Sequence, residues 1–449
     1  MRFAILPRRA NEPGVGVLMR NEGGFIAERR PGERGLAHLI EHIAFVSPTV
    51  GAPDDLHHLP HVGLKVTVAG GRPASTSWRE SNYYFSTNTT QPYDLDTMLG
   101  LLREVATDLT FRPDAVDSQR TDVMREMAEK QLGNRIFAGY IAAVAPGSPN
   151  DVIDAQNSDE VPTASIATIR ALYRRLYRPE NMMIVVVGNV DAERTKAMIE
   201  KRFGAWRVSN PVPTLPYVPA FQAERIVPIS VSALPQGRRT ALITVVLPTP
   251  QPPSTRAGQV AAMLMDLVVT RVVNDRLTST QPGNPAGKRG MFIENGDQGF
   301  RQIMLWDNFS IDQWRPAVAG LASLSCELRT AGFSVREWDI ARQAVIHDLE
   351  HRVNEMPGVA NVEIAKDLSH ALAAGQNPVL PNTLLEHARS WLPTVSAQTG
   401  SDWWQRQWSA GVDHIRVEAP ELAPLDQPLA AFRIVADEAV ADVQCKVRR

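Results

Sequence analysis

Cysteine, long apolar runs and excess charge are all scarce in this chain. Its 449 residues contain two cysteines, Cys326 and Cys445, which lie far apart, so they predict neither a disulfide framework nor a cysteine-bound zinc site. No stretch approaches the ~18 consecutive apolar residues that a membrane-spanning helix needs, and we therefore expect no membrane span. A net charge of −2 gives no general attraction to nucleic acid or to anionic lipid.

The N-terminus lacks the apolar stretch and cleavage site of a signal peptide. The segment RFAIL, residues 2–6, is typical of a strand, although it starts almost at Met1. This abrupt start suggests further residues upstream in the natural chain. If those residues carry an export signal we expect a bacterial periplasmic protein, and otherwise a cytoplasmic one.

The length predicts two domains, because a single hydrophobic core rarely serves so long a chain. Residues 210–221, NPVPTLPYVPAF, hold four prolines and are typical of an extended linker. The second half repeats the order of strands and helices of the first, without repeating its letters. We therefore predict two similar α+β domains, at 1–209 and 229–449, joined by a linker at 210–228.

Hydrophobic periodicity places the expected elements. The expected strands are 2–6, 15–19, 65–70, 81–87, 182–187, 240–248, 302–309 and 414–420. The expected helices are 95–109, 113–132, 165–177, 191–206, 257–277, 314–332 and 336–353, together with one that follows residues 33–35 and has 38–45 as its middle.

The segment GLAHLIEHIAF, residues 35–45, sets two histidines and a glutamate among apolar residues. On a helix, His38 and His42 stand one turn apart on the same face and can direct both imidazoles at one Zn²⁺. The carboxylate of Glu41 can reach the same space and accept a proton from a zinc-bound water. The order His-x-x-Glu-His is the inverzincin signature. The alternative, two polar histidines at a helix edge, leaves the cost of burying three polar groups unexplained.

A catalytic zinc usually has three protein ligands and one open position, so a third ligand is needed. The best candidate is Glu126 in RTDVMREMAEK, on a helix with an apolar stripe. Asp122 and Glu129 on the same helix remain rivals. Each of the three acids could instead be an ordinary residue of a solvated helix face.

Four blocks in order resemble the M16 metallopeptidases, the family of insulinase, pitrilysin and the mitochondrial processing peptidase. They are RGLAHLIEHIAF, AGGRPASTSWRESNYYFSTN, QRTDVMREM and LYRPENMMIVVVGNVD, and they span residues 1 to about 206. The second half resembles the family more loosely, in its element order and in NDRL, and is similar to bacterial PqqL-like members. The resemblance implies that each domain is a mainly antiparallel sheet packed with helices, and that the two form half of a clamshell.

The resemblance also implies the parts of an active site. His38, His42 and Glu126 would bind one zinc ion, and Glu41 would activate water. Gln119 and Glu80 would support the ligands from behind. A peptide would bind as an added strand along the glycine-led strand, at Gly70, Gly71, Arg72, Ala74 and Ser75. The partner would be a second copy or a related M16 chain, giving a homodimer or a heterodimer.

Three departures from the family pattern affect the expected activity. Pro73 stands where the family usually has asparagine, and it removes a backbone donor. Gln119 replaces a glutamate two helical turns before the third ligand. The arginine and tyrosine that touch substrate in many members have no clear match after NDRL, where residues 278–290 are expected to form a loop. The spacing between His42 and Glu126 is also a few residues longer than usual.

We therefore consider three functions. The first is a zinc endopeptidase acting on peptides or unfolded segments. The second is a weak or inactive subunit that binds peptide or supports an active partner. The third is a metal-dependent hydrolase of other substrates, which the strand-like peptide-binding block disfavours.

Two further clusters invite a functional interpretation. His57, His58 and His61 fit no ordinary metal-ligand spacing, and we expect a solvated helix end there. Trp403, Trp404 and Trp408 have helical spacing, and we expect them to pack in a core or an interface.

Overall fold

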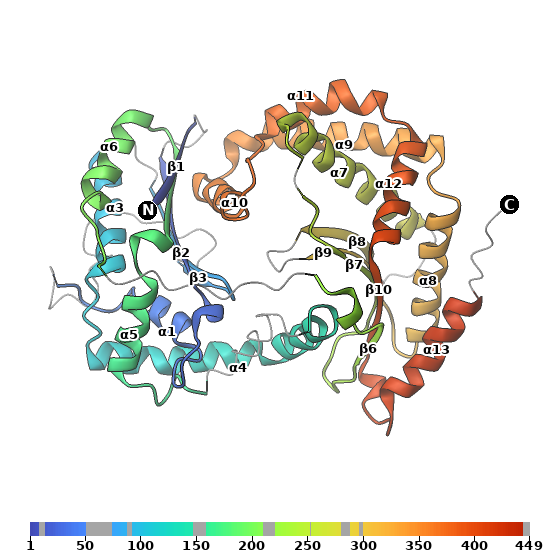
Figure 1. The fold of residues 1–449 in the computed structure, drawn as a ribbon, viewed down its shortest axis with the longest axis horizontal. Coiled ribbons are helices and arrows are strands. Elements are labelled where there is room, and N and C mark those ends of the chain that lie inside the picture. The colour runs from blue at the N-terminus through green and yellow to red at the C-terminus, as the bar shows by residue number, and fades with distance from the viewer. Residues whose placement is uncertain are drawn as a thin grey trace. The chain divides into compact units, whose positions relative to one another are not determined.

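The computed structural model describes nine stretches of the chain. They are residues 1–8, 14–50, 74–87, 92–146, 159–209, 221–251, 253–279, 288–295 and 300–442. Cα packing divides the chain into two compact units, which Figure 1 draws as a ribbon. Unit 1 comprises residues 1–134, 152–217 and 355–378, and unit 2 comprises residues 135–151, 218–354 and 379–449.

Unit 1 is built on a five-stranded sheet in the order β1-β5-β2-β4-β3. Its strands are β1 (Arg2–Pro7), β2 (Val15–Glu22), β3 (Ala74–Thr76), β4 (Glu80–Thr87) and β5 (Met182–Gly188). β1 runs parallel to β5, and the other three pairs are antiparallel. Every residue of β2 and β5 is buried, as expected of central strands covered on both faces.

Unit 2 repeats this topology in a second sheet, β6-β10-β7-β9-β8. Its strands are β6 (Ile229–Ser232), β7 (Thr240–Pro248), β8 (Arg289–Asn295), β9 (Phe300–Asn308) and β10 (Val412–Glu418). Again the first and last strands of the unit pair in parallel and the other three pairs are antiparallel. The predicted fold class, α+β with two similar sheets packed with helices, is confirmed. The short strand β6 and the edge strand β8 were not predicted.

Helices cover one face of the unit 1 sheet and build its main core. They are α1 (Leu36–Ile43), α3 (Pro92–Thr107), the first part of α4 (Pro113–Val144), α5 (Ile166–Leu176) and α6 (Ala192–Phe203). The fully buried Leu39, Leu102 and Val123 come from three of these helices, and Val17 and Ile184 come from the sheet beneath them. The helix that carries His38, Glu41 and His42 therefore belongs to the core that holds this unit together.

The opposite face of the unit 1 sheet carries α10 (Asn361–Ala373), which comes from the second half of the sequence. Val362 and Ala365 of α10 pack on Leu18 and Val185 of the sheet. A Cβ atom at Gly16 would lie 2.4 Å from the backbone nitrogen of Val362, so glycine is needed for this close approach.

Unit 2 has its own helices around a single core. They are α7 (Arg256–Ser279), α8 (Trp314–Thr330), α9 (Val335–Glu355), α11 (Pro381–Trp391), α12 (Ala397–Ala410) and α13 (Pro428–Asp442). Trp404 and Trp408 are buried in this core and Trp403 packs against it, which confirms the packing role expected for the three tryptophans.

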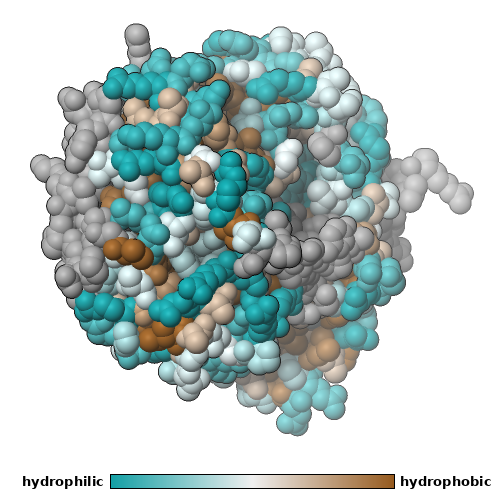
Figure 2. All heavy atoms as spheres, turned by 60° about the vertical axis from the view of Figure 1, so that its left-hand side comes forward, coloured by the Kyte–Doolittle hydropathy of each residue, from teal (hydrophilic) through white to brown (hydrophobic). Residues whose placement is uncertain are grey.

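Among the described residues, one helix is long and apolar enough by length and composition to cross a membrane, α7 over residues 256–278. Its side chains Val260, Leu264, Val268 and Val272 belong to the core of unit 2, which accounts for their apolar character. On the face seen in Figure 2, hydrophilic residues predominate and apolar residues form small separate groups.

The domain boundaries predicted from the sequence, 1–209 and 229–449, stay a prediction. By packing, residues 355–378 join unit 1 and residues 135–151 join unit 2. Of the predicted linker 210–228, residues 210–220 lie outside the described residues, as do the expected strand 65–70 and the three clustered histidines at 57, 58 and 61. In the expected loop 278–290, Arg289 and Gly290 already belong to β8.

The last turns of α4 lie against the second face of the unit 2 sheet. Tyr140 donates a hydrogen bond to Gln302, and Arg416 donates one to the carbonyl of Ile136 at 3.1 Å. Beside them His414, with no exposed surface, contacts the carbonyl of Val227 through Nδ1 at 2.5 Å. Burial lowers the pKa of His414 to about 4, and the Arg416 guanidinium acts in the same direction.

This buried histidine predicts a loss of stability in mild acid. The pKa is lower in the folded chain than in the unfolded one, so stability is full above pH 6.5 and falls as the pH drops towards 4. At pH 5 the loss amounts to about 2 kcal/mol. Urea unfolding at pH 7.5 and at pH 5 measures this loss. Between these two pH values, the unfolding free energy should fall by about 2 kcal/mol less in His414→Gln than in the wild type. The exposed His347→Gln is the control, and an unchanged pH dependence in His414→Gln would contradict the assignment.

Candidate metal centre

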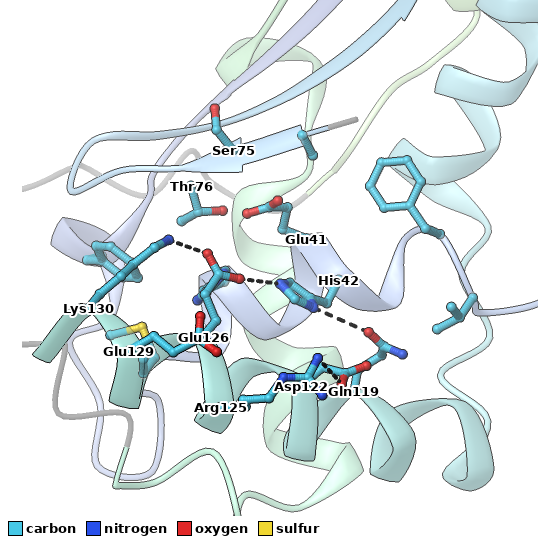
Figure 3. A pocket seen from close by; sticks show the side chains of 16 residues that line it. Glu41, His42, Ser75, Thr76, Gln119, Asp122, Arg125, Glu126, Glu129 and Lys130 are labelled. Carbon is cyan, nitrogen blue, oxygen red and sulfur yellow. Dashed lines mark hydrogen bonds and ion pairs between the residues drawn. The ribbon is translucent and has the colours of Figure 1, made fainter. Parts of the chain in front are cut away.

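The helix α1 carries the predicted motif and is only eight residues long. Gly35 precedes it with φ of 83°, a left-handed conformation that suits glycine. Leu36, Leu39, Ile40 and Ile43 are fully buried and fix the helix to the core. The opposite side of the helix presents His38, Glu41 and His42 to a cavity. Figure 3 shows Glu41 and His42 in this cavity. The spacing of the apolar residues thus determines which side chains face the cavity.

The structure brings His38, His42 and Glu126 together. Oε2 of Glu126 lies 3.5 Å from Nε2 of His38 and 3.4 Å from Nε2 of His42. The two imidazole rings meet nearly edge to face, with centroids 4.8 Å apart. Potential ligand atoms of the three residues all lie within 4.8 Å of one another, and the described part of the chain has no second group of this kind.

These distances fit a divalent metal held by three protein ligands. In a tetrahedral site with bonds of about 2.0–2.2 Å, ligand atoms are separated by about 3.3–3.6 Å. The two distances from Glu126 Oε2 to the imidazole nitrogens fall in this range. Two imidazoles and one carboxylate are also ligands that suit zinc. The residues present therefore fit a zinc ion.

Glu126 comes from α4, whose neighbouring side chains Val123 and Met127 are buried in the core of unit 1. A hydrogen bond from His38 is the main cause that holds the pKa of Glu126 well below its usual range, and a hydrogen bond from Lys130 acts in the same direction. The carboxyl group is therefore ionised and ready to bind a cation. The rival acids Asp122 and Glu129 line the same cavity without joining the group of three.

The second imidazole has a partner behind it. Nδ1 of His42 lies 3.3 Å from Oε1 of Gln119, also on α4. If this amide oxygen accepts the Nδ1 proton, Nε2 of His42 keeps the lone pair that a metal needs. The predicted supporting role of Gln119 is consistent with this contact and stays a prediction. Nδ1 of His38 is buried and has no hydrogen-bond partner.

Glu41 lies beside the ligands without belonging to them. Its side chain is buried, and Figure 3 shows its carboxylate near the hydroxyl of Thr76 on β3. Burial raises the pKa of Glu41, whereas the neighbouring His38 and a hydrogen bond with Thr76 lower it. A carboxylate in this position can exchange a proton with a molecule in the cavity.

The cavity around these groups has a volume of about 610 Å³. Ala74, Ser75 and Thr76 of β3, the last of the described strands of its sheet, form one wall. Among them, Ser75 shares a hydrogen bond of 2.6 Å with the hydroxyl of Tyr84. The other predicted peptide-binding residues, Gly70, Gly71 and Arg72, lie outside the described residues, as does Pro73.

Glu80, the other predicted supporting residue, lies elsewhere. It is the first residue of β4, is buried, and accepts a hydrogen bond of 3.1 Å from Arg20 on β2. It does not line the cavity, and the structure shows no contact between it and the ligands. Its place in the sequence, at the start of a strand, did not reveal the arginine on the neighbouring strand.

Sequence reasoning missed the groups that hold the start of α1. The carboxylate of Glu28 accepts hydrogen bonds from the backbone N–H groups of Gly35 at 2.8 Å and Ala37 at 2.7 Å. Burial raises the pKa of Glu28 to about 8, while these two hydrogen bonds lower it in part. Glu33 is fixed in turn by two hydrogen bonds from Arg175 of α5, at 2.7 and 2.6 Å. In the sequence, the one available sign was an acidic residue shortly before the predicted helix.

Removal of Glu28 should loosen the metal-binding helix. In Glu28→Ala two buried N–H groups lose their acceptor, which costs about 2–4 kcal/mol of unfolding free energy. Affinity for zinc should also fall, because His38 follows Ala37 directly. Urea unfolding and zinc competition with a chelator measure the two effects. Glu160→Ala is the control, since Glu160 accepts the N–H of Arg34 at 2.7 Å in an exposed position. Equal results for the two variants would contradict this account.

Comparison with known proteins supplies independent evidence of the family to which the chain is related. Residues 22–136 match the family model for Insulinase (Peptidase family M16), and residues 163–281 match that for the Peptidase M16 inactive domain. The probable zinc protease PqqL of Escherichia coli (strain K12) is 27% identical over 208 residues, which is 44% of this chain and 22% of that protein. The mitochondrial-processing peptidase subunit beta of Blastocladiella emersonii is 26% identical over 192 residues, 42% of this chain and 39% of that one.

Solved structures agree on the fold. The crystal structure of the periplasmic protease PqqL from Escherichia coli superposes with a TM-score of 0.79 at 19% identity, covering 98% of this chain and 49% of that one. The crystal structure of its first half gives a TM-score of 0.77 at 18% identity, covering 98% and 94%. The chain therefore spans about half the length of the whole PqqL structure.

Proposed function

The chain belongs to the M16 (insulinase) family of peptidases, and from this premise we propose that it is a zinc-dependent endopeptidase. Its substrates are peptides or unfolded protein segments. The observation that carries the proposal is the meeting of one oxygen of Glu126 with the Nε2 atoms of His38 and His42, next to the buried Glu41. These are the ligand types and the neighbouring carboxylate that zinc-dependent hydrolysis requires.

Each residue then has a separate task. When bound, Zn²⁺ supplies a Lewis acid that polarises the scissile carbonyl and makes water more acidic. His38, His42 and Glu126 hold the ion, and Gln119 orients His42. Glu41 takes the proton from the attacking water and returns it to the leaving amine. Thr76 contacts the Glu41 carboxylate and holds it in place for both transfers.

Substrate binding falls to β3. Among the described strands, β3 is the last one of its sheet and lines the cavity, so a peptide can pair with it through backbone hydrogen bonds. Ala74 and Ser75 belong to this strand. Backbone pairing accepts many sequences, which suits a peptidase of broad specificity.

We also propose that a second M16 unit completes the working enzyme, either a copy of this chain or a related one. The support is that the chain corresponds to half of PqqL in length and fold, and resembles a single subunit of the mitochondrial-processing peptidase. An enclosed cavity would admit unfolded peptides and exclude folded proteins.

A subunit that binds peptide without cleaving it is the alternative. Gln119 in place of a glutamate favours it, because an amide stabilises a metal-bound imidazole less than a carboxylate does. The intact set of His38, Glu41, His42 and Glu126 favours the peptidase.

The direct test is Glu41→Gln, which keeps the shape and removes the base. We expect zinc content to stay at the wild-type level while cleavage of a pool of fluorescence-quenched peptides falls at least about 100-fold. Glu363→Gln is the control, since Glu363 is an exposed carboxylate of α10 paired with Lys366, and it should cleave at the wild-type rate.

Two results would contradict the peptidase. One is cleavage by Glu41→Gln at the wild-type rate. The other is a zinc-loaded wild-type chain that cleaves no peptide, alone or with a related M16 chain, which would support the binding subunit instead.

A further inference from the structure

The two oxygens of the Glu126 carboxylate have different partners. Oε2 faces Nε2 of His38 and of His42 at 3.5 and 3.4 Å. Oε1 is paired with the ammonium of Lys130, one helical turn further along α4. In Figure 3 the dashed lines run from Lys130 through Glu126 and His42 to Gln119.

Seen alone, the pair of Lys130 and Glu126 is an ordinary one. Glutamate four residues before lysine is a common pairing on helix surfaces and adds little to stability. The exposed fractions, 42% for the lysine side chain and 31% for the glutamate, fit that description. The difference is that this carboxylate also completes the only three-residue metal-binding group in the described part of the chain.

Such a carboxylate can bind a metal through one oxygen or through both. A catalytic zinc has three protein ligands and keeps its fourth position for water or substrate. If Oε1 of Glu126 turned towards the ion, it would take up space that the water needs. A cation on Oε1 opposes that rotation, because the oxygen would have to leave its ion-pair partner.

On this basis, and resting on the proposed function, we infer that Lys130 is a positioning residue that keeps Glu126 a one-oxygen ligand and so keeps a coordination position open. Lys130 acts on the metal only through Glu126. On the other side of the site, Gln119 holds His42 through Nδ1. Lys130 limits the rotation of the Glu126 carboxylate in the same indirect way.

The inference can be tested by the coordination number of Co²⁺ bound in place of zinc. The visible absorption of Co²⁺ is several times stronger in a tetrahedral site than with five or six ligands. Lys130→Met keeps the length of the side chain without its charge, and Lys130→Arg keeps a charged donor. Arg125→Met is the matched control for the spectrum, since Arg125 lines the same cavity from the same helix but pairs with Asp122 at 2.8 Å.

We expect a strong tetrahedral spectrum for the wild type, Lys130→Arg and Arg125→Met, and absorption at least about twofold weaker for Lys130→Met. Zinc affinity of Lys130→Met should be equal to that of the wild type or tighter, because a second oxygen adds a bond. Its kcat should fall at least about tenfold with KM changed less than about threefold, since an open position serves the reaction rather than peptide binding.

A wild-type spectrum in Lys130→Met would overturn the inference and leave the proposed function standing. A wild-type chain that binds no Co²⁺ would overturn both. If Lys130→Met loses its helical circular dichroism, Lys130→Gln serves the same comparison, with the same spectrum expected and the same result contradicting the inference.

Discussion

The site depends on one carboxylate meeting two imidazoles that come from a different helix. His38 and His42 lie one turn apart on α1, and Glu126 comes from α4, so the three meet only when both helices are packed on the same core. No local interaction could assemble this group. Its geometry therefore reflects the tertiary packing of unit 1, and a change in that packing would change the distances between the three side chains.

Packing alone does not hold α1 in place, because the helix is two turns long. A helix so short is marginal by itself, and its first N–H groups have no partners within it. Glu28 supplies two of the missing acceptors from a buried position. Arg175 of α5 binds Glu33, which lies between Glu28 and the start of α1, and so fixes this segment to α5. These groups never reach the cavity, yet they determine where the histidines stand. We therefore propose that the candidate metal centre is held from three sides, by Glu28 at the helix start, by Gln119 behind one imidazole and by Lys130 behind the carboxylate.

Much of the site was predictable, because its signature is local in the sequence. The spacing of His38, Glu41 and His42 places all three on one side of any helix, whatever surrounds it. Glu126 needed the family resemblance to be chosen over Asp122 and Glu129, since helical periodicity alone does not show which acid faces another helix. For Glu80, the sequence likewise did not show its partner Arg20, which sits on a neighbouring strand, and its supporting role stays a prediction. The contribution of Glu28 depends on a turn whose shape the letters do not reveal.

The fold class followed from the repeated order of strands and helices, which both sheets reproduce. The order of elements did not show that each unit includes a segment from the other half of the sequence. The helix α10 lies on the sheet of unit 1, and the end of α4 lies on the sheet of unit 2. From sequence order, each helix is expected in the half of the chain that contains it. In the folded protein, a helix packs on the sheet face that buries its apolar side chains, and the strands of that sheet can be distant in the sequence.

The central claim is that one divalent ion is bound by two histidines of α1 and the carboxylate of Glu126. Metal analysis after dialysis against a zinc buffer tests it most directly, with the wild type and Glu126→Ala side by side. The account predicts one zinc per wild-type chain and an affinity at least about 100-fold weaker in the variant, because a ligand is lost rather than a supporting group. Equal zinc binding by the two proteins, or none by the wild type, would contradict it.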